Sequence, residues 1–187
     1  MVRGRLKVPQ GSRRASRRAI AIWTAVIVVL ATNSAWAAAI PTLLVLPLDM
    51  VDTSGETPSH AQEHTDRLAA LTQSLSKELG ARGLYAIIDP TPIGARIDKA
   101  RAAQPLDECN GCELDLARLV HADRVLTGEV DKVSTLIGSL RLRIVNVATG
   151  QAVFARVVGF RGDTDEAWQH AMRFLVHDLE ATAAPQR

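Results

Sequence analysis

The two cysteines of the chain, Cys109 and Cys112, are separated by two residues and offer the clearest chemistry in the sequence. Such a pair forms a disulfide in an oxidising compartment, and elsewhere it serves as a redox dithiol or as two metal ligands. A redox dithiol needs a low thiol pKa, which the acidic neighbours Asp107, Glu108 and Glu113 oppose by repulsion. A metal ion needs two further ligands, and covalent haem needs a histidine where Glu113 follows the second cysteine. We therefore expect a structural disulfide and no cofactor, with thiol-disulfide or metal-handling chemistry as the alternative.

A second candidate is the segment His60–His64, whose letters HAQEH spell the H-x-x-E-H pattern of inverted zinc peptidases. The segment lies at a polar junction between a loop and a helix, and no acidic third ligand is marked downstream. We interpret it as the solvated start of a helix rather than as a metal site. Because the chain also lacks a G-x-S-x-G elbow and a phosphate loop, the sequence favours a protein that is not an enzyme.

Arginines in the last third of the chain form the third candidate. With a two-residue turn at Thr149-Gly150, Arg143 faces Arg156 across a hairpin, and directly opposed like charges are destabilising. A longer turn shifts the register and removes this contact. Both alternatives stay open at this point, and Arg141, Arg143 and Arg156 are a possible partner surface.

The first 37 residues have the composition of a secretory signal peptide. They contain seven basic residues and no acidic one, then the apolar run Ala19–Ala31, then Ala35-Trp36-Ala37. A basic head, a short apolar middle and a small-x-small end are what a signal peptidase needs, and the run is shorter than a membrane span. We predict that residues 1–37 are a signal peptide cleaved near Ala37, which would deliver the protein to the periplasm. An uncleaved amino-terminal anchor is the alternative.

Removal of this leader reverses the charge of the protein. Seven of the 22 basic residues lie in the leader, so 15 remain against 20 acidic residues, a net charge of −5. A domain with a net negative charge binds nucleic acid poorly in a non-specific way, so we expect no nucleic-acid binding. We also expect no membrane span once the leader has been cleaved. Aromatic residues make up only 4% of the chain, so its core must be mainly aliphatic.

The hydrophobic periodicity predicts a single α/β domain over residues 38–180, followed by a disordered tail, 181–187. Apolar or alternating runs indicate strands at 42–46, 84–88, 124–130, 140–145 and 152–160, and helical spacing indicates helices at 61–79, 91–103, 113–120 and from 163 onward. Residues 49–59 are expected to form a loop. The predicted order is β-α-β-α-α-β-β-β-α, which implies a mixed five-stranded sheet with packed helices.

Two helices carry clear apolar stripes. The predicted inward residues are Leu68, Leu71, Leu75 and Leu79 in one helix and Trp168, Met172 and Leu175 in the other. We expect the last helix to begin at Asp163, with Glu166 completing a capping box.

Three segments resemble a family of short exported bacterial proteins, identified as the domain of unknown function 2380. These segments are Asp107–Cys112, the strand at Thr127-Gly128, and Phe160–Trp168. The resemblance implies an exported protein and a fold, but it implies no activity.

More distant similarity links the chain to domains of the bacterial cell envelope. His121–Gly128, Arg143–Gly150 and Leu44–Leu48 are similar to strands of the amino-terminal domain of the Tol-system translocation protein, of the curli-secretion lipoprotein and of lipoprotein activators of penicillin-binding proteins. This similarity implies interaction or accessory work with an unknown envelope protein. A thiol-disulfide or metal-handling protein centred on Cys109 and Cys112 is the alternative, and the oligomeric state stays open.

Overall fold

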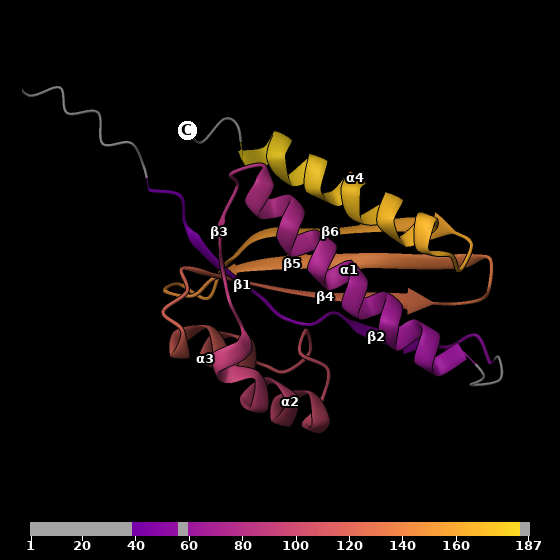
Figure 1. Ribbon diagram of the computed structural model, residues 1–187, viewed down its shortest axis with the longest axis horizontal. Coiled ribbons are helices and arrows are strands. Elements are labelled where there is room, and N and C mark those ends of the chain that lie inside the picture. The colour runs from indigo at the N-terminus through magenta and orange to yellow at the C-terminus, as the bar shows by residue number, and fades with distance from the viewer. Residues whose placement is uncertain (1–38, 56–59, 184–187) are drawn as a thin grey trace, which may run out of the picture. The chain divides into compact units, whose positions relative to one another are not determined.

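The computed structural model describes residues 39–55 and 60–183 (Figure 1). The predicted signal peptide therefore lies outside the described residues. In chain order the elements are β1 (Thr42–Val45), β2 (Asp49–Asp52), α1 (Ala61–Ala81), β3 (Ala86–Ile88), the short 3-10 helix η2 (Thr91–Ile93), α2 (Gly94–Ala103), α3 (Cys112–Leu119), β4 (Arg124–Lys132), β5 (Ile137–Asn146), β6 (Ala152–Arg161) and α4 (Asp165–Ala183).

The strands form one mixed sheet in the order β3-β1-β4-β5-β6, and β2 also pairs with β4. The pairs β1–β3, β1–β4 and β2–β4 are parallel, whereas β4–β5 and β5–β6 are antiparallel. Parallel neighbours need crossover connections, here the helices, whereas the later strands return through short turns. The predicted mixed α/β class is confirmed.

The sheet has one strand more than predicted, because part of the expected loop 49–59 is β2. Strand β1 pairs with the start of β4, from Arg124 onward, and β2 pairs with its end, from Glu129 onward. Pro47 lies between the two short strands, where it has no N–H group to donate to the ladder. The chain therefore stops pairing with β4 near this proline and pairs with it again from Asp49 onward.

One face of the sheet is covered by α1 and α4, which lie side by side in Figure 1. Leu71, Leu75 and Leu79 are fully buried, and Leu68 is partly buried against the same core. Trp168, Met172 and Leu175 of α4 complete this cluster. Both predicted apolar stripes are confirmed, and burial of this kind stabilises the fold by about 2 kcal/mol per large aliphatic side chain.

The other face is covered by α2 and α3 over β1 and β4. Ile97 and Leu116 pack there against Leu44, Leu46 and Val125. Alternation along β5 and β6 places a further set of side chains on this face, and all of them are exposed or half-exposed. We call this set the open face; it consists of Ile137, Ser139, Arg141, Arg143, Ala155, Val157 and Arg161.

Helix α4 begins two residues later than predicted. The Thr164 hydroxyl accepts a hydrogen bond from the Ala167 N–H at 3.3 Å, so Thr164 and not Asp163 supplies the side-chain cap. The helix continues to Ala183 and thus includes the first residues of the predicted tail. Within the described ranges, no helix is both long enough and apolar enough to span a membrane.

Candidate functional site

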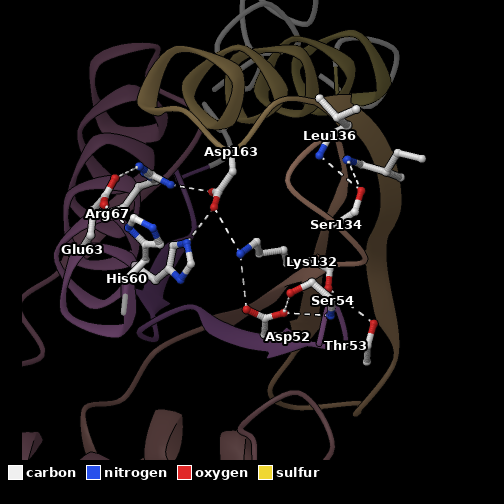
Figure 2. Close-up of polar contacts among 12 residues, drawn as sticks. Asp52, Thr53, Ser54, His60, Glu63, Arg67, Lys132, Ser134, Leu136 and Asp163 are labelled. Atoms are coloured by element: carbon white, nitrogen blue, oxygen red, sulfur yellow. Dashed lines mark hydrogen bonds and ion pairs between the residues drawn. The ribbon is translucent and has the colours of Figure 1, made fainter. Parts of the chain in front are cut away.

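A cluster of charged groups, with Arg67 and His64 buried at its centre, joins the start of α1 to the loop before α4 (Figure 2). Arg67 donates to Asp163 at 2.5 Å, to Asp165 at 2.6 Å and to Glu63 at 2.6 Å. His64 Nε2 lies 2.7 Å from the second oxygen of Asp163. We call these residues, together with Lys132 and Asp52, the α1–α4 ion cluster; Nζ of Lys132 lies 3.4 Å from Asp163 and 3.5 Å from Asp52.

The Trp168 side chain packs against this cluster. Its indole ring stacks on His64 with ring centroids 6.2 Å apart, and the Arg67 guanidinium lies 5.1 Å from the ring centroid. A cation over an indole face is attracted by the ring electrons. The cluster therefore combines ion pairs with packing and fixes the angle between α1 and α4.

Asp163 is the centre of the cluster. Burial alone raises its pKa, but the hydrogen bond from His64 and the positive charges of His64, Arg67 and Lys132 outweigh burial and lower the pKa overall. The segment His60–His64 is thus not a solvated helix start throughout: His60 is exposed and bound to Glu63, whereas His64 is buried. These side chains bind one another, which indicates a structural role.

The disulfide lies at the amino end of α3. Cys109 and Cys112 are bonded to each other, Cys109 is buried, and Cys112 is half-buried against the second core cluster. Glu113 lies beside the bond, with Oε2 3.3 Å from Cys109 Sγ and accepting the Gly111 N–H at 3.0 Å. Its other oxygen lies 3.7 Å from Nη1 of Arg143 on the open face.

Within the described ranges, one group of side chains brings three potential metal-ligand atoms within 4.8 Å of one another: Cys109, Cys112 and Glu113. Thiolates are the metal-binding form of cysteine. Because the two sulfurs are bonded to each other, they present no thiolates in this state.

Three carboxylates surround one guanidinium at the inner edge of the open face. Arg141 lies 3.0 Å from Glu129, 3.4 Å from Asp107 and 3.5 Å from Asp131. The Glu129 and Asp107 side chains are only 2% and 5% exposed, and one oxygen of each has no hydrogen-bond partner among the described residues. Burial, together with the negative charge of Asp107, raises the pKa of Glu129 to about 7, and burial also raises the pKa of Asp107.

The structure brings two of the three predicted arginines together. The turn between β5 and β6 is longer than two residues and the ladder contains a bulge, so Arg143 lies opposite Ala155 rather than Arg156. Arg141 and Arg143 share the open face. Arg156 lies on the opposite face, 3.1 Å from Asp178 of α4 and 5.7 Å from the Phe154 ring centroid.

A cleft of about 820 Å³ lies between α1 and the carboxyl ends of β1 and β3. Such crevices commonly bind ligands in open α/β sheets. Thr72 in its lining is already bonded: its Oγ1 accepts the Leu48 N–H at 3.2 Å and donates to the Leu68 carbonyl at 2.8 Å. Arg101 is paired with Asp49 at 3.1 Å.

Residues 41–179 match the protein family described as "Protein of unknown function (DUF2380)". The chain belongs to this family. The match covers all the elements from β1 to most of α4, so both the ion cluster and the disulfide lie inside it. No curated protein sequence is significantly similar to the chain.

Solved structures with a similar arrangement include a lipoprotein and two other bacterial proteins. The LpoB C-terminal domain from Salmonella enterica has 15% identity and a TM-score of 0.39, over 64% of this chain and 82% of that domain. Lipoprotein GNA1162 from Neisseria meningitidis has 14% identity and a TM-score of 0.49, over 78% of this chain and 99% of that lipoprotein. The PelC dodecamer from Paraburkholderia phytofirmans has 15% identity and a TM-score of 0.45, over 76% and 86%. At these scores the similarities support no conclusion about activity or partner.

Sequence reasoning missed the buried acids Glu129 and Asp107. Glu129 lies in a strand two residues after Thr127, on the face that packs against α3 and the segment before it. An acidic residue at an inward position of an otherwise apolar strand is the signal that could have found it. Asp107 carried no such signal, because its burial depends on how residues 105–111 fold over the sheet.

Proposed function

We propose that this protein is an exported, non-enzymatic interaction module of the cell envelope, and that its open face binds a protein partner. Export is supported by the leader pattern, a basic head followed by a short apolar run and Ala35-Trp36-Ala37. The mature domain would then work in the periplasm, with its Cys109–Cys112 disulfide kept by an oxidising compartment.

The chemistry of the open face carries this proposal. Ile137 and Val157 are 59% and 60% exposed, on neighbouring antiparallel strands. Arg161 is exposed beside Ile137, and Arg141 and Arg143 are half-exposed next to them. Arg141 and Arg143 are already paired with Glu129 and Glu113. The apolar side chains beside the exposed Arg161 therefore match a partner surface that is apolar with an acidic group at its edge. Arg156, on the opposite face, is outside this surface.

The polar groups of the α1–α4 ion cluster and Thr72 of the cleft support binding rather than catalysis. In the α1–α4 ion cluster, Arg67 and His64 are engaged by carboxylates of the same chain. In the cleft beside α1, Thr72 is bonded to the backbone. A general acid or base must reach a substrate proton, and groups held in this way are not directed at one.

The test is capture of a partner by the open face, with variants that leave the fold unchanged. The substitutions are Val157→Asp and Arg161→Glu, both at exposed positions, and the matched control is Phe174→Asp, an exposed apolar residue on α4. Mature protein is immobilised, incubated with an envelope fraction of its own source, and bound proteins are identified by mass spectrometry. The leading partner is then purified and titrated against each variant.

We expect saturable binding of one protein to wild type and to Phe174→Asp, and binding weakened by about tenfold or more in the two open-face variants. Loss of one central apolar contact at an interface has an effect of this size. Equal affinity of all four proteins for the partner, or no saturable partner at all, would contradict the proposal.

A further inference from the structure

We propose that the Cys109–Cys112 disulfide is a thiol-disulfide exchange centre that oxidises a dithiol, with Glu113 carrying the proton between incoming and leaving sulfur. This exchange is stoichiometric, one protein disulfide oxidising one dithiol, and it is separate from partner binding at the open face. It rests on the difference in exposure between the two cysteine residues and on the oxygen atoms around the Cys109 sulfur.

The two cysteines differ in access. The Cys109 residue is 3% exposed, whereas Cys112, the first residue of α3, is half-buried. Thiol-disulfide exchange needs in-line approach of a thiol sulfur to one sulfur of the bond. The incoming sulfur therefore attacks Cys112, and Cys109 is the leaving sulfur.

Two oxygen atoms surround the leaving sulfur. The Leu106 carbonyl oxygen lies 3.2 Å from Cys109 Sγ, and Glu113 Oε2 lies 3.3 Å from it. A disulfide sulfur carries no proton, so these oxygens gain no hydrogen bond in the oxidised state. Once Cys109 becomes a thiol, its S–H can donate to either oxygen. The surroundings thus favour the reduced form of Cys109 and make the disulfide easier to open.

Glu113 is held where it can serve both sulfurs. Its carboxylate lies within 4.8 Å of Cys109 and Cys112 sulfurs alike. The Gly111 N–H donates to it, and Arg143 lies 3.7 Å away, so its position does not depend on the disulfide. A negative carboxylate also disfavours a thiolate beside it, so Cys109 leaves as a thiol.

The reaction balances without another reagent. A substrate thiol gives its proton to Glu113, and its sulfur bonds to Cys112 as the bond to Cys109 breaks. The electron pair of that bond stays on Cys109, which takes the proton from Glu113. The second substrate thiol then attacks the substrate sulfur of the mixed disulfide and releases Cys112 as a thiol, its own proton passing to Cys112. The substrate dithiol loses two electrons and two protons, and the protein disulfide gains them.

The first experiment follows reduction of the native protein by dithiothreitol, with circular dichroism recorded in parallel. We expect the wild-type disulfide to open while the fold is retained, in a glutathione buffer as well as in dithiothreitol. Reduction that occurs only at the rate of global unfolding would overturn the proposal, whatever the variants show.

The second experiment compares Glu113→Gln with Asp115→Asn, which removes an exposed acid from the same helix. We expect Glu113→Gln to be reduced at least about tenfold more slowly than wild type, with a flattened pH profile, and Asp115→Asn to match wild type. Equal reduction rates for the two variants would refute the role of Glu113.

The third experiment uses the single thiols. In Cys109→Ser the remaining Cys112 should form a mixed disulfide with oxidised glutathione in the folded state, at least about tenfold faster than Cys109 does in Cys112→Ser. The reverse order, or equal rates, would contradict attack at Cys112.

Discussion

Replacement of Glu129 by glutamine should remove a pH dependence of stability that the wild-type fold carries. Glu129 lies under Arg141, and its pKa is raised to about 7 by burial and by the charge of Asp107, partly offset by Arg141. Glutamine has nearly the same shape, accepts from Arg141 through its amide oxygen, and does not titrate. The variant Glu129→Gln therefore tests how ionisation of Glu129 affects stability, with little change in the shape of the side chain.

The magnitude follows from proton linkage. A glutamate in the unfolded chain titrates near 4.5, whereas in the fold Glu129 keeps its proton up to about pH 7. Between these values the folded state binds more protons than the unfolded state, so the free energy of unfolding falls as pH rises. The full difference in pKa corresponds to a loss of about 3 kcal/mol in the free energy of unfolding. This loss is absent below pH 4.5 and complete above about pH 7.

The assay is urea unfolding at about pH 5 and about pH 8.5, followed by circular dichroism. Wild type should lose about 2–3 kcal/mol more than Glu129→Gln between the two conditions, and the exposed control Glu166→Gln should behave like wild type. The pKa of Asp107 is raised by burial in both proteins, so the comparison of wild type with Glu129→Gln isolates the contribution of Glu129. Equal pH slopes for wild type and Glu129→Gln would refute the reasoning.

Three further predictions concern the core, the sheet and processing. Leu75→Ala should cost about 2–5 kcal/mol in urea unfolding, because the side chain is fully buried, and a cost well under 1 kcal/mol would show that α1 packs differently. Gly128→Ala should lower the melting temperature and cost about 1–3 kcal/mol, because its Cβ would lie 2.7 Å from the Arg141 carbonyl oxygen and from two leucine methyl groups; an unchanged melting temperature would contradict this. The mature amino terminus should be Ala38, within about two residues, and mass spectrometry of periplasmic protein that finds the leader intact would contradict cleavage.

The helices and the hairpin were predictable because their signals are local. The spacing of Leu71, Leu75 and Leu79 defines one face of α1 without reference to any other segment. Alternation in β5 and the turn at Thr149-Gly150 define the hairpin in the same way, although not its register, which the longer turn and the bulge decide.

What the sequence did not predict depends on distant partners. The sequence predicts that Asp163 caps a helix, yet its hydrogen-bond partners His64 and Arg67 come from a helix about a hundred residues earlier. Strand β2 is polar and short, and it is a strand only because β4 offers unpaired backbone groups beyond Pro47. The burial of Glu129 is decided by the segment containing Asp107 that folds over it.

The α1–α4 ion cluster also has a consequence for the order in which the chain folds. The contact between His64 and Asp163 spans 99 residues, so it closes a very long loop and forms late. Until α4 arrives, the inward face of α1, with Leu71 and Leu75, has no helix to pack against. A chain that emerges amino terminus first thus lacks its final core until α4 is available. Under the proposed export, such late closure would delay folding before transport, and truncation of α4 would leave the core on this face of the sheet incomplete.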